Sequence, residues 1–465
     1  MNPAATITPL IRPAAGPRNG LTDPFETMNN QPLYSRRSLL KLLGTSAASA
    51  PFVSSNLFAQ EPVKTIRHAS FGAGGMAWSD LSQFAACKNV EIVAVCDVDL
   101  RKTADARKKF PNARIYQDWR ELLDKEAENI DSVNVSTPDH MHAPIGMRAM
   151  QLGKHVYGQK PLAHSLHEVR QMTELAHSAK VVTQMGIQVH STAYYRIAAQ
   201  VLKDLAVGKI KEVHSWSSKT WGDPSPRPET TDPVPAEFNW DLWLGVRAER
   251  PFIGGEYYHP ENWRKRLDFG TGTLGDMGCH ILDPVFEGLG LGGPVSVRSV
   301  GPAPNSWNWA IDGKVIYTFD GTPMTEGKTL QVTWYDGAAR PAAEIIALLE
   351  GKEFPDQGSI FIGTEGVILL PHIGLPELFS KEKFKDYQLP RIKGLNHWEQ
   401  FVEACRGNGE TSANFAYAGP LTEAILLGGI ASRFPNTTLA WNSRELKFDL
   451  ADANRFVREE YRKGW

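Results

Sequence analysis

Between residues 64 and 187, short apolar runs alternate with stretches that have a helical pattern. The run VEIVAVCDVD at 90–99 is almost continuously apolar and β-branched, as a parallel strand buried on both faces should be. Strands that alternate with helices predict an α/β fold with a doubly wound parallel sheet. The predicted strands are 64–71, 90–99, 113–119, 131–137, 154–158 and 181–186, and the predicted helices are 99–110, 119–126, 143–153 and 165–180, with another beginning near residue 76.

The later part of the chain has a different pattern. Alternating polar and apolar residues, bounded by turn residues, predict separate strands and one hairpin. The strands are 209–221, 295–301, 314–321 and 329–337, and the hairpin is 358–370. Amphipathic helices are predicted at 396–407 and 419–434, and the proline-rich stretch 222–238 predicts a surface excursion.

Length and composition limit the classes of protein. A chain of 465 residues is too long for one ordinary core, so we expect a leader at 1–60 and domains at 61–187 and 188–465. A net charge of −2 argues against a nucleic-acid partner. None of the four cysteines forms a CxxC pair, so the sequence predicts neither a zinc site nor a disulfide framework. After residue 60, no apolar run approaches the roughly 18 residues of a membrane span, so we expect no membrane segment in the mature form.

The first sixty residues have the pattern of an export signal. Arg36 and Arg37 in SRRSLLK precede a weakly apolar stretch and then small residues. This pattern predicts a twin-arginine signal, cut after Ala59 or after Ala50, and therefore a periplasmic protein whose partner is the twin-arginine export machinery. The alternative is a disordered basic leader. The long polar preface also leaves open whether translation begins at Met1 or Met28.

A glycine-rich turn follows the first predicted strand. Gly72, Gly74 and Ala77 form a G-x-G-x-x-A pattern, in which glycines permit a tight turn and close approach of a pyrophosphate. Asp97 ends the next strand, 25 residues after Gly72, where a carboxylate can accept hydrogen bonds from a ribose and repel a 2′-phosphate. We therefore predict NAD rather than NADP; the alternative for Asp97 is a turn residue. The predicted phosphate-binding turn is Gly72, Gly74, Gly75 and Met76.

Polar residues follow two of the later strands, at the edge where ligands bind in such sheets. The stretch STPDHMHAPIGMRAMQLGKHVYGQKPLAHS (136–165) resembles the glucose–fructose oxidoreductase / inositol dehydrogenase / MocA family of nicotinamide-dependent enzymes. The resemblance covers essentially all of residues 64–460 and implies a second α/β domain with an open, mostly antiparallel sheet. It also implies that the cofactor contacts Ser136, Thr137, Pro138, His142, Gln159 and Lys160. Gln159 stands where the family has glutamate, which leaves the charge on Lys160 less compensated.

Residues 275–283, GDMGCHILD, place Asp276, His280 and Asp283 on one stripe of a predicted helix. The stripe alone fits either a buried polar cluster or the wall of an active site. The stretch resembles the family's D-x-G-x-H-x-x-D helix, which implies a catalytic set of Lys160, Asp276 and His280. In that set His280 is the base, Lys160 the polarising cation and Asp276 the positioning group. For Asp283, anchoring of the helix and substrate contact remain equally open.

Several other residues are candidates for substrate binding. Residues 209–265 are rich in tryptophan and tyrosine, whose faces stack on sugar rings, although such residues also build cores. With the family resemblance, they predict a carbohydrate-like substrate near Gln188, His190, Tyr194, Arg196, Trp263, Arg264 and Asp283. His140 and His142 form an H-x-H pair, but no carboxylate or cysteine stands at ligand spacing, so we predict no metal.

These patterns lead to one function and two alternatives. We expect an exported nicotinamide-dependent oxidoreductase that acts on a sugar, a polyol or a sugar derivative. Because the periplasm has no recycling pool of soluble NAD, such an enzyme should hold its cofactor tightly. The first alternative is a redox-neutral glycosidase, lyase or epimerase that uses NAD transiently. The second is a non-catalytic nucleotide- or sugar-binding protein. The resemblance further implies a homo-oligomer, a dimer or a tetramer.

Overall fold

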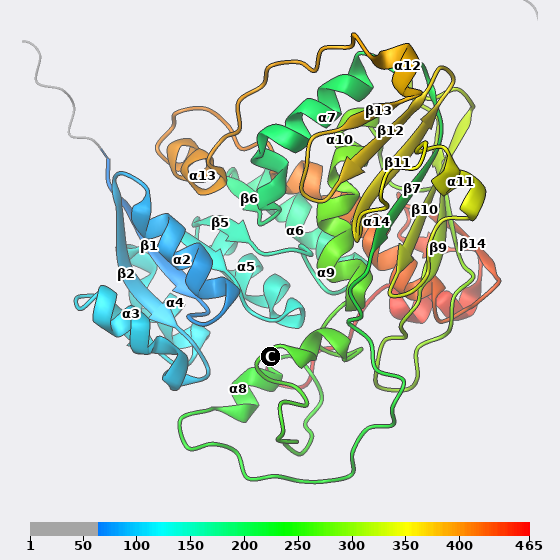
Figure 1. The fold of residues 1–465 in the computed structure, drawn as a ribbon. Coiled ribbons are helices and arrows are strands. Elements are labelled where there is room, and N and C mark those ends of the chain that lie inside the picture. The colour runs from blue at the N-terminus through cyan, green and yellow to red at the C-terminus, as the bar shows by residue number, and fades with distance from the viewer. Residues whose placement is uncertain (1–63) are drawn as a thin grey trace, which may run out of the picture. The chain divides into compact units, whose positions relative to one another are not determined.

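The first sheet confirms the predicted doubly wound architecture. The computed structural model describes residues 64–465, so the predicted leader, with its twin-arginine motif and cleavage site, lies outside the described residues. Six parallel strands pair in the order β3-β2-β1-β4-β5-β6 (Figure 1). The chain adds β2 and β3 on one side of β1 and then β4, β5 and β6 on the other side, so the strand order switches between β1 and β4. They are β1 (Ile66–Phe71), β2 (Val90–Cys96), β3 (Arg114–Tyr116), β4 (Ser132–Val135), β5 (His155–Gly158) and β6 (Thr183–Met185).

Helices follow these strands as predicted. α6 begins with a capping box, in which Ser165 and Glu168 satisfy each other's backbone N–H groups at the first turn. By contrast, the N-cap of α2 is Gly75, which has no side chain to satisfy the free N–H groups. The helices are α2 (Met76–Ala86), α3 (Ala104–Lys109), α4 (Trp119–Glu126), α5 (His142–Gln151) and α6 (Leu166–Ala179).

Two polar residues inside β1 explain why this strand has an irregular apolar pattern. His68 is buried and its ring contacts the side chains of Ser132 and Asn134 in β4, at 2.8 and 3.0 Å. Ser70 donates to the carbonyl oxygen of Gly72 at 2.8 Å. Because each polar group has a partner in the neighbouring backbone or strand, the strand remains buried without an apolar sequence.

The second sheet has nine strands in the order β13-β12-β11-β7-β10-β9-β8-β14-β15 (Figure 1). Its pairs are antiparallel except for β7 and β10, so the predicted mostly antiparallel sheet is confirmed. The strands are β7 (Ile210–Ser217), β8 (Ser296–Ser299), β9 (Lys314–Asp320), β10 (Thr329–Asp336), β11 (Gln357–Gly363), β12 (Val367–Pro371), β13 (Glu377–Phe379), β14 (Thr438–Asn442) and β15 (Lys447–Phe448). The domain boundary at residue 187 stays a prediction.

One helix corrects the prediction from its pattern. α14 packs against α6 of the first half and against α9 and β8 of the second, so most of its residues are buried. The prediction of an amphipathic helix at 419–434 is therefore wrong, because this helix has no broad solvent face. The helices of this half are α7 (Ala193–Lys203), α8 (Trp240–Leu244), α9 (Gly272–Ile281), α10 (Asp283–Leu289), α11 (Ala343–Ala347), α12 (Lys381–Phe384), α13 (His397–Cys405) and α14 (Phe415–Ala431).

The segment between β7 and α9, residues 218–271, contains the proline-rich stretch 222–238, and the whole segment is called the excursion from here on. It returns to the first sheet and is held there by hydrogen bonds. The backbone N–H of Asn239 donates to Val98 at 2.9 Å, and that of Leu100 donates to Glu237 at 3.0 Å. The ring of His259 lies 3.1 Å from the carboxylate of Asp99. The excursion, which carries α8 (Figure 1, green), is therefore pinned just beyond the carboxyl end of β2. No helix among residues 64–465 is long and apolar enough to cross a membrane.

Candidate active site

A cavity of about 480 Å³ lies where the first sheet meets the second half of the chain, within the range common for ligand sites. Most of the residues predicted to bind cofactor or substrate line it. They are Gly72, Gly74, Gly75, Met76, Asp97, Ser136, Thr137, Pro138, His142, Gln159, Lys160, Gln188, Trp263, Arg264, Asp276 and His280. His190, Tyr194, Arg196 and Asp283, also predicted, are not part of its lining.

The glycine turn has the shape that a pyrophosphate requires. Gly72 has a φ of +102°, and a Cβ there would lie 2.6 Å from the carbonyl oxygen of Ser136. Gly75 has a φ of +54° and faces open space, and as the N-cap of α2 it leaves the first N–H groups of that helix without a side-chain partner. An anion at this helix start would accept those N–H groups and interact favourably with the helix dipole.

Asp97 lines the same cavity and is held by backbone groups. One carboxylate oxygen accepts the N–H of Ala73 at 2.8 Å and the other accepts the N–H of Asp99 at 2.9 Å. Burial raises the pKa of Asp97 to about 6. The carboxylate is therefore mostly ionised at neutral pH, and each oxygen keeps an acceptor position for a ribose hydroxyl. Together with the glycine turn, these residues fit NAD.

Gln159 makes a contact that sequence reasoning missed. Its side-chain amide donates to the carboxylate of Asp80 at 2.7 Å, and the Ser136 hydroxyl donates to the same oxygen at 2.8 Å. The indole N–H of Trp398, in α13, donates to the other oxygen at 3.0 Å. Asp80 is fully buried in α2, and its position on the same helix face as Ala77, Leu81 and Phe84 was the available signal. Although Gln159 stands where the family has a glutamate, the carboxylate of Asp80 lies beside it.

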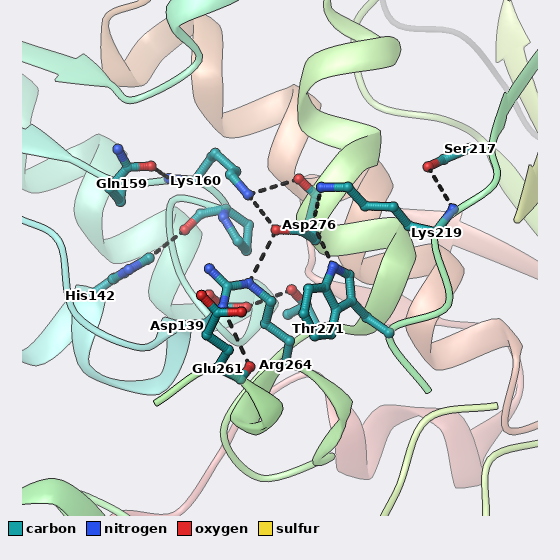
Figure 2. A network of polar contacts seen from close by, with 12 residues as sticks. Asp139, His142, Gln159, Lys160, Ser217, Lys219, Glu261, Arg264, Thr271 and Asp276 are labelled. Atoms are coloured by element: carbon teal, nitrogen blue, oxygen red, sulfur yellow. Dashed lines mark hydrogen bonds and ion pairs between the residues drawn. The ribbon is translucent and has the colours of Figure 1, made fainter. Parts of the chain in front are cut away.

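Asp276 is the centre of the polar network in Figure 2. One of its oxygens lies 2.8 Å from Nζ of Lys160 and 3.3 Å from Nε of Arg264. The other lies 3.2 Å from Nζ of Lys219 and accepts the indole N–H of Trp221 at 2.8 Å. Gln159 supplies no charge to Lys160, and Asp276 supplies one from the second half of the chain.

Charge determines the protonation of Asp276. Burial alone would raise the pKa of its carboxyl, but the positive charges of Lys160, Arg264 and Lys219 hold that pKa well below its usual value. Asp276 is therefore a carboxylate throughout the physiological range. Lys219 and Trp221 were not predicted as partners of Asp276. Neither stands at a fixed spacing from it in the sequence, so no local pattern could have identified them.

His280 lies one helical turn after Asp276 in α9 and is a neutral imidazole at neutral pH. Burial lowers its pKa well below the ordinary value, and the nearby charge of Lys160 lowers it further. Its Nδ1 atom has no hydrogen-bond partner among the described residues. Its ring stacks on that of His372, with 6.0 Å between centroids, and Nδ1 of His372 lies 2.6 Å from the hydroxyl of Tyr195. A neutral imidazole beside an ammonium group can accept a proton from a bound hydroxyl.

Asp283 does not share the stripe of Asp276 and His280. α9 ends at Ile281, and α10 begins at Asp283 with Pro284 in its first turn, so the prediction of one continuous stripe is wrong for this residue. The buried carboxylate of Asp283 contacts the ring of His190 at 2.9 Å and accepts the hydroxyl of Tyr417 at 2.7 Å. These contacts favour the anchoring role for Asp283.

The remaining predicted residues have backbone or aromatic partners. The ring of His142 lies between the carbonyl oxygens of Thr137 and Pro161, 2.8 Å from each, and Arg196 donates to the backbone of Lys393. Most aromatic residues of 209–265 pack against one another; for example, the rings of Trp240 and Trp243 stack with centroids 4.9 Å apart. A contact of any of these residues with substrate stays a prediction.

Comparisons with known proteins agree with this geometry. Residues 66–187 match the model of an oxidoreductase family with an NAD-binding Rossmann fold. Residues 209–325 match the model of the C-terminal alpha/beta domain of the same oxidoreductase family.

Among proteins of known activity, levoglucosan dehydrogenase of Pseudarthrobacter phenanthrenivorans is 24% identical over 194 residues, which are 42% of this chain and 40% of that protein. Alpha-N-acetylgalactosaminidase of Shewanella oneidensis is 32% identical over 123 residues, 24% of this chain and 26% of that protein. The chain thus matches less than half the length of either relative. The WlbA dehydrogenase from Bordetella pertussis, solved with NADH and UDP-GlcNAcA, has a TM-score of 0.57 at 15% identity over 82% of this chain and 99% of that one, which shows a shared fold.

Proposed function

The chain belongs to the Gfo/Idh/MocA family of oxidoreductases with an NAD-binding Rossmann fold, and on this premise we propose that it oxidises a hydroxyl group of a sugar, polyol or sugar derivative. The observation that carries the proposal is the convergence of Lys160, Asp276 and His280 on the cavity that the glycine turn also lines. One titratable base and one ammonium group are the protein groups that alcohol oxidation needs.

Each of the three residues has a distinct role in the proposal. The glycine turn and Asp97 would hold NAD, which would supply the acceptor for the hydride that leaves the substrate carbon. His280, neutral at working pH, takes the hydroxyl proton. The ammonium group of Lys160 stabilises the negative charge that develops on the substrate oxygen. Asp276 fixes that ammonium group through its contact at 2.8 Å and so acts as a positioning residue.

We also propose that the cofactor is retained through many turnovers and that the protein is exported. The support for retention is the excursion, which is fastened to Val98, Asp99 and Leu100, directly after Asp97. A cofactor beside Asp97 would therefore leave only when those contacts open. The support for export is the twin-arginine pattern at Arg36 and Arg37.

A test of the function compares the wild type with Lys160→Met and His280→Gln. The purified chain is saturated with NAD and given a panel of sugars and polyols, while NADH formation is followed by absorbance. We expect a fall of at least about a hundredfold in kcat/KM for both variants. Lys211→Met, an exposed lysine of β7 outside the cavity, is the matched control and should retain full activity. Unchanged activity in both Lys160→Met and His280→Gln would show that the assignment is wrong.

A second candidate is cleavage of a glycoside without net oxidation. The observation that favours it is the similarity to alpha-N-acetylgalactosaminidase. That similarity covers one aligned stretch of 123 residues. A retained cofactor suits a reaction in which NAD is regenerated in every cycle. Nitrophenyl glycosides distinguish the two candidates: release of nitrophenol without added NAD and without net NADH formation favours glycoside cleavage.

A further inference from the structure

Three cationic side chains share one carboxylate in the active-site cavity. Lys160, Lys219 and Arg264 come from three separate segments, and all of them contact Asp276 (Figure 2). With Trp221, they bring four donor groups to the two oxygens of Asp276. One negative charge therefore faces three positive charges, and its oxygens have little acceptor capacity left.

Two of these cations retain donors that face the cavity. Lys219 has Asp276 as its one described acceptor, at 3.2 Å, and its side chain is 45% exposed. Arg264 donates to Asp276 and, at 3.4 Å, to the backbone oxygen of Glu261, while its other terminal nitrogen has no acceptor among the described residues. Both residues line the cavity. Lys160, in contrast, donates from its ammonium group to the backbone carbonyl oxygen and to one carboxylate oxygen of Asp276, at 2.8 Å each.

The guanidinium group of Arg264 is held in place before any ligand arrives. It lies 4.4 Å from the ring centre of Trp263 and 5.3 Å from that of Trp221. Aromatic faces on which a guanidinium group stacks restrict it to a plane and leave its N–H edge free. Such a fixed edge is suited to an oxyanion, because binding then costs little side-chain entropy.

The other acidic residues of the cavity do not neutralise these charges. Asp139 accepts the hydroxyl of Thr271 at 2.6 Å and forms no described ion pair. Glu261 is exposed, and its contact with Arg264 is through the backbone. Asp97 is held by the N–H groups of Ala73 and Asp99. A pyrophosphate at the glycine turn would find its donors in the uncapped N–H groups at the start of α2, so the surplus charge at Lys219 and Arg264 would remain for the substrate.

We propose that the substrate carries an anionic group, a carboxylate or a phosphate monoester, and that Lys219 and Arg264 bind it while Lys160 and His280 act on a hydroxyl of the same molecule. This inference rests on the proposed function and adds the substrate class to it. Lys219 and Arg264 are then specificity-determining residues rather than members of the proton-transfer set. Charged hydrogen bonds of this kind distinguish an anionic sugar from its neutral parent by roughly tenfold or more.

Calorimetric binding tests the inference independently of turnover. The full chain, saturated with NADH so that no alcohol is oxidised, is titrated with three matched sets: hexoses, hexuronates and hexose 6-phosphates. We expect one anionic set to bind at least about tenfold more tightly than the hexoses, with an affinity that falls as salt rises. Tight binding of the hexuronates identifies a carboxylate site, and tight binding of the phosphates identifies a phosphate site.

Variants then assign the effect to residues. Lys219→Met and Arg264→Met should each remove most of the preference for the anionic set, because each should lower the affinity for that set far more than the affinity for hexoses. Lys211→Met, on the same strand that leads to Lys219, should leave both affinities unchanged. Equal affinity for neutral and anionic sugars in the wild type would overturn the inference and leave the proposed oxidation intact. Tight anion binding that depends on Lys219 and Arg264, without any hydride transfer, would support the inference and contradict the proposed function.

Discussion

Replacing Asp276 by asparagine removes a charge while keeping the shape of the side chain. The carboxylate is almost fully buried, and the three cationic groups around it lie at 2.8, 3.2 and 3.3 Å. In Asp276→Asn these groups face one another without a counter-charge. The amide also has fewer acceptor positions than a carboxylate, so it cannot accept all four donors.

The cost of the change is dominated by Lys160. The Lys160 side chain is only 14% exposed, and breaking a buried ion pair from one side costs about 3–5 kcal/mol. The pair with Lys219 adds little, because that side chain is 45% exposed and solvent screens it. We therefore expect the free energy of unfolding to fall by about 3 kcal/mol, which corresponds to a melting temperature about 3–4 °C lower in a chain of this size.

The pH dependence of this loss has a definite sign. Because the folded-state pKa of Asp276 lies well below 3.8, its value in an unfolded chain, the carboxylate stabilises the fold fully above that value. The difference between wild type and Asp276→Asn should therefore be constant from pH 8 to about pH 5, and it should shrink only as the pH falls below about 4. Urea unfolding at several pH values measures it.

Asp336→Asn is the matched control. Asp336 is also a buried carboxylate, but it accepts hydrogen bonds from neutral groups, the backbone of Gly313 at 2.6 Å and the indole of Trp334 at 3.0 Å, and it does not line the cavity. Both variants should lose stability, whereas only Asp276→Asn should lose kcat/KM, by about 100-fold. If Asp276→Asn unfolds at the same urea concentration as the wild type, the cations do not depend on this carboxylate and the reasoning is refuted.

Three further predictions follow from single residues. Because desolvation lowers the pKa of His280 well below 6.5, kcat/KM should stay flat from pH 8 to about 6.5 and decline only at lower pH. A decline centred at 6.5 or above would contradict a base with a lowered pKa. Gly72→Ala should abolish retention of NAD while the chain still folds, as equilibrium dialysis and circular dichroism would show, because the added Cβ would lie 2.6 Å from the carbonyl oxygen of Ser136. Burial lowers the pKa of His68 to about 4, so on acidification the unfolded chain binds a proton at this residue before the folded chain does. The free energy of unfolding should therefore fall by roughly 3 kcal/mol between pH 6.5 and 4. His68→Gln should remove that part of the decrease, as measured by urea unfolding at several pH values.

The first half of the fold could be predicted because its signals are local. β2 is nearly continuous in β-branched residues, and the glycine turn needs only the spacing of Gly72, Gly74 and Ala77. The hydrophobic pattern led to a wrong prediction for a helix that is buried on nearly all sides. α14 lies between α6 and α9, so its sequence carries no polar face that would mark its orientation. The break between α9 and α10 did leave a signal in Pro284, since proline is favoured in the first turn of a helix.

Residues of the candidate site could be predicted only where titratable side chains stand at a regular helical or motif spacing within one segment of the sequence. Asp276 and His280 lie four residues apart in α9, and a helical repeat alone places them on one face. Asp80 and Gln159 are 79 residues apart, and their contact at 2.7 Å exists only because α2 packs beside the end of β5. Trp398 reaches Asp80 from α13, a helix that comes after strands β7 to β13 of the second sheet. No pattern within a window of the sequence specifies such a contact.

The charge surplus around Asp276 is also a product of folding. A net charge of −2 over 465 residues argues against a nucleic-acid partner, yet it averages over the whole surface and gives no information about one cavity. Lys160 follows β5, Lys219 follows β7, and Arg264 lies in the excursion between α8 and α9. Their charges add only because both sheets and the excursion close around a single carboxylate. The proposed charge of the substrate is therefore an inference that only the folded site supports and that binding measurements can test.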